Sequence, residues 1–114
     1  EEVFVSLHAN TFSQAQYPGL QVWYSPNHAG SAVLAEHIRT AVTASLQPDN
    51  HRQSKQAGSN IFLLHKLQIP TVLVECGFLS NPAECNALAD PAYRDRLAHA
   101  LYKGICAYYE CDTQ

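Results

Sequence analysis

The chain has 114 residues, a formal net charge of −3 at pH 7 and a hydrophobic content of 46%. These values suit a single globular domain, and the slightly acidic balance excludes an electrostatic basis for binding nucleic acid. Every apolar run is far shorter than the about 20 residues that a transmembrane helix requires, so we expect neither a transmembrane segment nor a nucleic-acid partner.

The N-terminal part of the chain predicts two β-strands separated by a loop. Residues 3–7 combine β-branched and aromatic side chains, which is typical of a strand. Because side chains alternate along a strand, the odd-numbered residues, which are all apolar, would share one face, and His8 would lie on the opposite face. Residues 9–19 are mostly polar and include a Pro-Gly pair, which favours a loop. Residues 20–24 predict the second strand.

A long helix is predicted next. Apolar residues recur at helical spacing over residues 27–46, and Pro48 would end the helix because proline has no backbone N–H to donate. Residues 51–60 are polar and partly basic, which favours a loop. Residues 61–64 predict a short strand or turn.

The C-terminal half predicts one buried strand and two helices. Residues 71–74 are apolar or β-branched and lead directly into Glu75. Asn81-Pro82 combines an N-cap residue with proline at the first helical position. Asp90-Pro91 repeats that pattern at the start of a final helix, which we expect to extend to about residue 109.

The order of these elements predicts the fold class. Strands alternate with helices, and the strand at residues 71–74 is apolar on both faces, which is typical of a sheet covered by helices. We therefore predict an α/β fold with an open, mostly parallel twisted sheet and flanking helices. The chain contains no methionine, so we also expect it to be part of a longer translation product.

Four cysteines, at positions 76, 85, 106 and 111, have neither CxxC spacing nor the density of a disulfide framework. Free or buried thiols are the favoured interpretation, and one or two disulfides are the alternative.

Two predicted strands end in titratable side chains, His8 and Glu75. Sites in open α/β sheets form beyond the carboxyl ends of the strands, so neighbouring strands would bring this imidazole and this carboxylate together. Each residue also has a simpler interpretation: Glu75 as a carboxylate that faces water or pairs with a cation, and His8 as a hydrogen-bonded loop or core histidine. As a pair they could supply a metal ligand and a general base.

Two segments of the chain resemble a known enzyme family. Residues 4–10, Phe-Val-Ser-Leu-His-Ala-Asn, resemble the SxHxN strand end of the zinc-dependent N-acetylmuramoyl-L-alanine amidases of type 3. Residues 70–82, Pro-Thr-Val-Leu-Val-Glu-Cys-Gly-Phe-Leu-Ser-Asn-Pro, are similar to the PxxLVExGFLSN segment of the same family. Residues 90–93 and 101–105 are similar to its last helix. The resemblance covers essentially the whole chain, and within the family it is closest to the spore-cortex and germination type.

The resemblance implies an activity and three site residues. It makes His8 a zinc ligand, Glu75 the catalytic carboxylate and Asn10 a substrate-binding residue. The implied cofactor is Zn²⁺, and the implied reaction is hydrolysis of the amide bond between N-acetylmuramic acid and L-alanine by a zinc-activated water. Peptidoglycan is then the principal partner, with a possible activating or localising protein. Because peptidoglycan lies outside the cytoplasmic membrane, the implied location is extracytoplasmic.

The chain also departs from the family pattern. The two other zinc ligands of the family, a histidine in a Gly-rich turn and a glutamate in the first helix, have no counterpart here. Catalytic zinc normally has three protein ligands, and the remaining histidines have no recognisable ligand spacing; they are His28, His37, His51, His65 and His99. We therefore expect residues 1–114 to be the C-terminal portion of an amidase catalytic domain whose first strand and helix are missing, and which alone is inactive.

Two other functions are weighed against the amidase. One is a non-catalytic peptidoglycan-binding or regulatory relative with the same fold and a degenerate site. The other is a different metallohydrolase, such as a carboxypeptidase, on a similar sheet. The Gly-Phe-Leu-Ser-Asn continuation at residues 77–81 argues against the second alternative.

Overall fold

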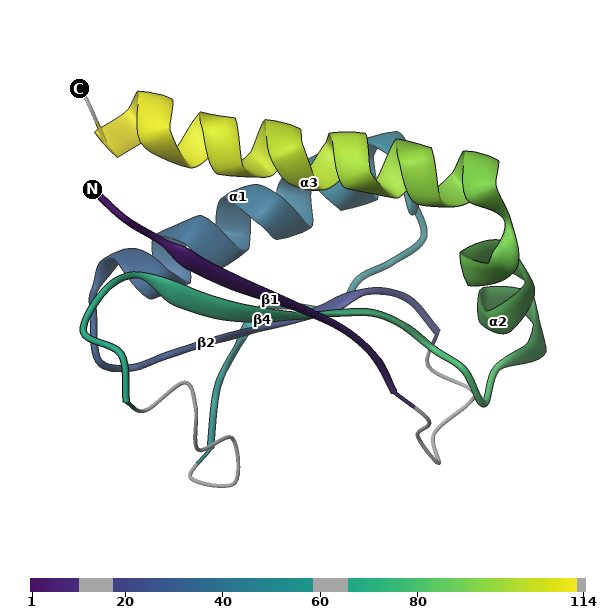
Figure 1. Cartoon of the computed structure of the whole chain (residues 1–114), viewed down its shortest axis with the longest axis horizontal. Coiled ribbons are helices and arrows are strands. Elements are labelled where there is room, and N and C mark those ends of the chain that lie inside the picture. Colours follow the sequence, from purple (N-terminus) through teal and green to yellow (C-terminus); the bar gives the residue numbers. More distant parts are fainter. Residues whose placement is uncertain (11–17, 59–65, 113–114) are drawn as a thin grey trace.

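The computed structural model of the chain describes residues 1–10, 18–58 and 66–112. The elements in these ranges are, in chain order, β1 (Phe4–Asn10), β2 (Gln21–Tyr24), α1 (Gly30–Ser45), β3 (Lys55–Gln56), β4 (Thr71–Phe78), α2 (Pro82–Ala89) and α3 (Pro91–Asp112). Figure 1 shows a sheet with α1 and α3 packed side by side over one of its faces and α2 at one end.

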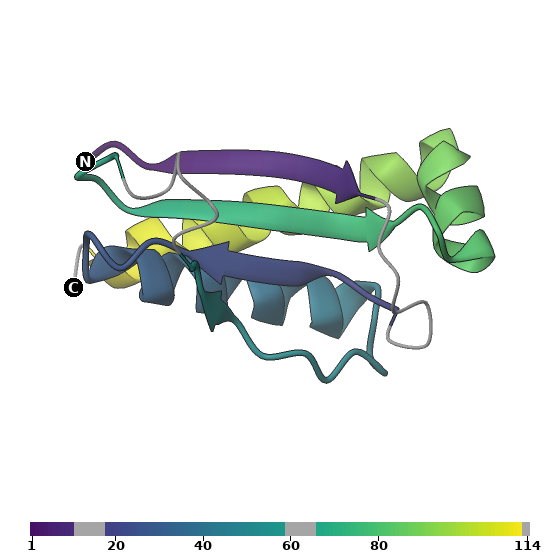
Figure 2. The same ribbon diagram turned by 90° about the horizontal axis from the view of Figure 1, so that it is seen from below.

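The strands form one open sheet in the order β1-β4-β2-β3. β1 pairs with β4 and β2 pairs with β3 in parallel, whereas β2 and β4 are antiparallel. Figure 2 shows the strands β1, β4 and β2 side by side, with the helices behind them. The predicted α/β fold with a mostly parallel sheet and flanking helices is confirmed, and the β2–β4 pair is the antiparallel exception.

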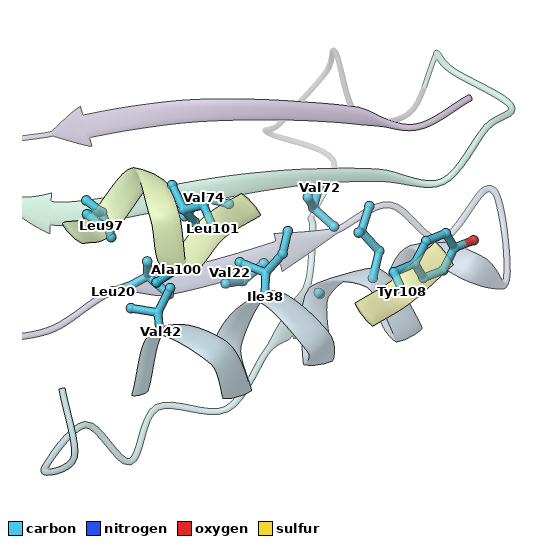
Figure 3. Packing of buried hydrophobic residues seen from close by; sticks show 12 residues of the cluster. Leu20, Val22, Ile38, Val42, Val72, Val74, Leu97, Ala100, Leu101 and Tyr108 are labelled. Atoms are coloured by element: carbon cyan, nitrogen blue, oxygen red, sulfur yellow. The ribbon is translucent and has the colours of Figure 1, made fainter. Parts of the chain in front are cut away.

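The hydrophobic core lies between the sheet and the helices α1 and α3 (Figure 3). Its members come from β2, β4 and both helices; they are Leu20, Val22, Leu34, Ala35, Ile38, Val42, Val72, Val74, Leu97, Ala100, Leu101 and Tyr108. Gly104 permits the close crossing of α1 and α3, because a Cβ at this position would lie 2.6 Å from the Cα of Ile38.

Both predicted proline-containing helix starts are confirmed. The Asn81 side chain accepts hydrogen bonds from the backbone N–H groups of Ala83 and Glu84, with proline at the first helical position. The Oδ1 atom of Asp90 likewise accepts from the N–H of Ala92 at 3.0 Å. These caps satisfy N–H groups that have no partner inside the helix.

The strand limits differ from the sequence prediction. β1 and β4 continue to Asn10 and Phe78, beyond the predicted ends at residues 7 and 74. β3, a strand of two residues, lies inside the predicted loop at 51–60, because backbone pairing with β2 places few demands on its polar side chains. The short strand or turn predicted at residues 61–64 lies outside the described residues.

Two further predictions concern individual side chains. Leu7, which strand alternation places on the same face as Val3 and Val5, is 57% exposed, because β1 is the edge strand and no described element covers its C-terminal end. Val3 and Val5 do pack against the core. The thiols of Cys76, Cys85 and Cys106 are free, as the favoured interpretation predicted, and the side chain of Cys111 is outside the described set.

Candidate active site

His8 and Glu75 lie next to each other at the same edge of the sheet. They are directly paired Cα partners in the parallel β1–β4 ladder, and side chains at paired positions share a face of the sheet. Val74 points into the helix-covered core, so alternation places Glu75 and His8 on the opposite face. The imidazole and the carboxylate therefore lie side by side, as the sequence analysis predicted.

Glu75 is a buried carboxylate with one satisfied oxygen. Its side chain is 5% exposed, and its Oε1 atom accepts a short hydrogen bond from Nδ2 of Asn10. Its Oε2 atom is buried and has no hydrogen-bond partner among the described residues. Burial raises the pKa of Glu75 above its ordinary value, while hydrogen bonds from Asn10 and the charge of His8 oppose that rise. A carboxyl group in this setting is suited to accept and return a proton.

The imidazole of His8 is at the surface and partly oriented. Its Nε2 atom lies 3.0 Å from the hydroxyl of Ser6, two residues earlier on the same face of β1. A hydrogen bond to one ring nitrogen is the usual way in which a metal-binding histidine is held, with the other nitrogen directed at the ion. Ser6 is thus a residue of the site that supports His8.

The donor set fits part of a zinc site. The exposed imidazole of His8 is suited to be one protein ligand of the metal, and the buried carboxylate beside it, with its unsatisfied oxygen, is suited to be the neighbouring base. Within residues 1–10, 18–58 and 66–112 no group of three or more His, Cys, Asp and Glu side chains could hold a metal ion. His28 has a different environment, since its Nδ1 atom accepts from the backbone N–H of Gly30 at 2.9 Å.

Cys76 follows Glu75 directly and is a possible nucleophile by residue type. Its side chain packs on the core side of β4, and burial, assisted by the charge of Glu75, raises its pKa to about 11. With this pKa, Cys76 stays protonated at neutral pH. Because only the thiolate is strongly nucleophilic, Cys76 is a poor nucleophile in this position. A cavity of about 200 Å³ borders this thiol, and Ala87, Leu88 and Tyr93 are among its lining residues.

The structure adds Gln21, Arg52 and Phe78 to the face that holds His8 and Glu75. Phe78 lies on this face because the β1–β4 ladder has a register shift that pairs it with Asn10, so simple alternation from Glu75 does not apply to it. Gln21 is the Cα partner of Glu75 on β2 and is 2% exposed. Nη1 of Arg52 donates to Oε1 of Gln21 at 3.3 Å, and its guanidinium lies 5.2 Å from the centroid of the Phe78 ring. The one sequence signal was a glutamine inside an apolar strand, which needs hydrogen-bond partners when buried. Arg52 stood in a polar loop without any signal.

This fold and this site define an α/β domain in which a buried carboxylate and an exposed imidazole lie side by side on two parallel strands. The sequence matches the N-acetylmuramoyl-L-alanine amidase family over residues 1–107. The chain belongs to this family.

Two curated relatives come from Bacillus. The germination-specific N-acetylmuramoyl-L-alanine amidase of Bacillus subtilis (strain 168) is 32% identical over 108 residues, which cover 95% of this chain and 45% of that protein. An uncharacterized cell wall amidase of Bacillus anthracis is 34% identical over 117 residues, which cover 96% of this chain and 21% of that protein. The chain therefore spans less than half of either relative.

Solved structures show the same fold. The CwlD amidase from Clostridioides difficile, in complex with the GerS lipoprotein, superposes with a TM-score of 0.89 and 38% identity over 96% of this chain and 55% of that one. An N-acetylmuramoyl-L-alanine amidase of Nostoc punctiforme superposes with a TM-score of 0.82 and 28% identity, covering 95% of this chain and 58% of that one. Among the described helices, none has the length and apolar content needed to cross a membrane.

Proposed function

We propose that the protein to which this chain belongs hydrolyses the amide bond between N-acetylmuramic acid and L-alanine in peptidoglycan, with zinc as its cofactor. The observation that carries the proposal is the buried Glu75 carboxylate paired across β1 and β4 with the exposed imidazole of His8. Membership of the amidase family supports the choice of substrate bond.

Glu75 acts in this proposal as the general base and then as the general acid. Its unsatisfied Oε2 atom accepts the proton of the attacking water and later returns a proton to the departing nitrogen of L-alanine. A pKa that burial has raised favours the second half of this cycle, because the carboxyl group holds the proton long enough to deliver it. Bound zinc supplies polarisation of the scissile carbonyl and a lower pKa for the attacking water.

His8 holds the metal from the β1 side in this proposal, and Ser6 orients its ring. The remaining ligands come from a part of the protein outside this chain, consistent with the 55% coverage of the CwlD structure. In this view residues 1–114 form the C-terminal portion of the catalytic domain, without its first strand and helix.

Asn10 has a position that supports a role in orienting Glu75. Its Nδ2 atom donates to Glu75 Oε1, which leaves the second carboxylate oxygen for the reaction. The contact between Asn10 and substrate that the family resemblance implies stays a prediction.

The location and the partners follow from the substrate and the relatives. Peptidoglycan places the reaction outside the cytoplasmic membrane, at the cell wall or the spore envelope. The similarity to a germination-specific amidase favours the spore cortex. Because the CwlD amidase was solved together with the GerS lipoprotein, a protein that activates or localises the enzyme is part of the proposal.

A non-catalytic wall-binding relative is the second candidate. Burial of a carboxylate with one unsatisfied oxygen costs stability, and such groups are concentrated at catalytic sites. A binding protein would gain nothing from retaining Glu75 in this state, so the amidase is favoured.

The test uses the full-length protein with muramoyl-peptide substrates. Mass spectrometry should detect released peptides with a free L-alanine amino terminus, and metal analysis should detect zinc. Glu75→Gln should retain zinc and lose about two to four orders of magnitude in turnover, the usual contribution of a general base, whereas His8→Ala should lose zinc. Turnover of Glu75→Gln near the wild-type rate would rule out Glu75 as the base.

A further inference from the structure

The face of the sheet that holds Glu75 continues on its other side into an anchored guanidinium group. Gln21 of β2 lies opposite Glu75 in the antiparallel β2–β4 ladder, as His8 of β1 does in the parallel ladder. His8, Glu75 and Gln21 therefore form one row across three strands, and neighbouring strands are about 5 Å apart.

The amide of Gln21 is committed to contacts away from Glu75. Its Nε2 atom donates to the backbone oxygens of Gln53 and Val22, at 2.8 and 3.1 Å. Its Oε1 atom accepts from Nη1 of Arg52 at 3.3 Å. Since both ends of the amide are used and the side chain is 2% exposed, Gln21 acts as a fixed support for Arg52.

Arg52 is held at two further points. Its backbone N–H donates to Oδ1 of Asn50 at 2.9 Å, and its guanidinium lies over the ring of Phe78 at 5.2 Å. Phe78 is the Cα partner of Asn10, whose amide donates to Glu75. The guanidinium is therefore anchored close to the candidate base, and a pre-oriented guanidinium loses less entropy on binding a carboxylate than a free one.

The charge on this side of the face is positive. Lys55 lies 5.9 Å from the ring centroid of Trp23, and Trp23 shares a face of β2 with Gln21 because the two are at alternate positions of the strand. Arg52 and Lys55 thus flank the row on the β2–β3 side. A planar guanidinium is the side chain best matched to a carboxylate, which it can bind through two parallel hydrogen bonds.

We propose that Arg52 binds a carboxylate of the stem peptide, on the residue that follows L-alanine, and so makes the enzyme selective for substrates in which that carboxylate is free. This inference rests on the proposed amidase function. With the scissile bond at Glu75, the next residue of an extended peptide lies about 3.5 Å further along. A peptide that lies across the strands in the direction from Glu75 to Gln21 therefore places this residue on the Arg52 side of the row.

The test compares two muramoyl-L-alanyl-D-glutamyl peptides that differ by an α-carboxylate or an α-carboxamide on the glutamyl residue. The full-length wild-type protein should show a lower KM for the carboxylate peptide. Arg52→Gln should raise that KM by about 10- to 100-fold, the range expected for a lost hydrogen bond to a charged group, with little change in kcat and no preference left between the peptides. Arg52→Lys should restore part of the preference.

Arg96→Gln is the matched control, because Arg96 also lies over an aromatic ring, that of Tyr93 at 5.7 Å, but on α3. It should leave the preference unchanged.

Binding of both peptides to Glu75→Gln and to Glu75→Gln/Arg52→Gln separates recognition from turnover. Selective binding that depends on Arg52, together with no turnover by the zinc-loaded wild-type protein, would support Arg52 and contradict the amidase function. Turnover with equal KM for the two peptides, or an equal loss on both in Arg52→Gln, would overturn the role of Arg52 and leave the amidase function intact.

Discussion

Asn10 donates a hydrogen bond to the Glu75 carboxylate across the β1–β4 pair, although 65 residues separate the two in the chain. The contact orients one oxygen of a buried acid and lowers the pKa that burial has raised. The candidate base and its orienting residue are therefore supplied by two strands that only the folded sheet brings together.

Replacing Asn10 by alanine should shift the acidic limb of the activity profile. Loss of the amide removes one contribution that lowers the pKa of Glu75, so this pKa rises further and Glu75 becomes protonated at a higher pH. We expect the acidic limb of kcat/KM in the full-length protein to move to higher pH, with a loss of about tenfold at neutral pH from the missing hydrogen bond. An unshifted limb would show that Asn10 does not act on Glu75.

The ionisation of Glu75 should also be visible in stability. The folded pKa lies above the unfolded value, so the folded chain holds the proton more tightly. The resulting stabilisation is complete below the unfolded pKa and is lost as pH rises through the folded pKa. Because glutamine cannot ionise, Glu75→Gln should be more stable than the wild type at about pH 8, and the difference should shrink towards about pH 4. Urea unfolding at several pH values measures this, and a pH-independent difference would contradict it.

The isolated chain of residues 1–114 should self-associate. β1 is an edge strand whose Leu7 side chain is 57% exposed, and unpaired strand edges tend to pair with other chains. Sedimentation and thermal melts at increasing concentration should reveal association, and Leu7→Lys should reduce it because a charged residue on an edge opposes pairing. The matched control is Leu79→Lys, at an exposed leucine beyond the end of β4. A monomer that melts independently of concentration would contradict the prediction.

A single metal ligand should give weak zinc binding in the same isolated chain. Zinc sites draw their affinity from several ligands held together, and the described residues offer His8 without a cluster of three donors. Calorimetric titration should show no tight stoichiometric zinc site. An assay of peptide release should show no amidase activity. Tight binding that His8→Ala leaves unchanged would place the zinc elsewhere in the chain.

Replacing Gly104 by alanine tests the packing of α1 against α3, because the expected change in the free energy of unfolding is opposite to that from helix propensity. Alanine in the middle of an exposed helix is normally more stable than glycine by about 1 kcal/mol. At Gly104 the added methyl group would meet the Ile38 backbone at 2.6 Å, so Gly104→Ala should instead destabilise the chain by about 1–3 kcal/mol. Urea unfolding measures the change, with Ala98→Gly on the exposed side of α3 as a reference for helix propensity alone.

Local patterns in the sequence were sufficient for most of the elements. Strand signals around residues 3–7 and 71–74, the helical spacing before Pro48 and the two caps at Asn81 and Asp90 each predicted an element that is present. These signals act between residues that are close in the chain. The two-residue strand β3 escaped prediction because it forms through backbone pairing with β2 and has no apolar pattern of its own.

The sequence by itself determined the α/β class, the family resemblance and the identity of the three candidate residues His8, Asn10 and Glu75. Tertiary structure alone decided that β4 lies between β1 and β2. This order pairs Glu75 with His8 on one side and with Gln21 on the other, and it brings Arg52 to the same face. Strand order depends on the packing of the whole core against α1 and α3, whereas a motif records only its own residues. For that reason the candidate ligand and the candidate base could be named from the sequence, and the guanidinium on the same face could not.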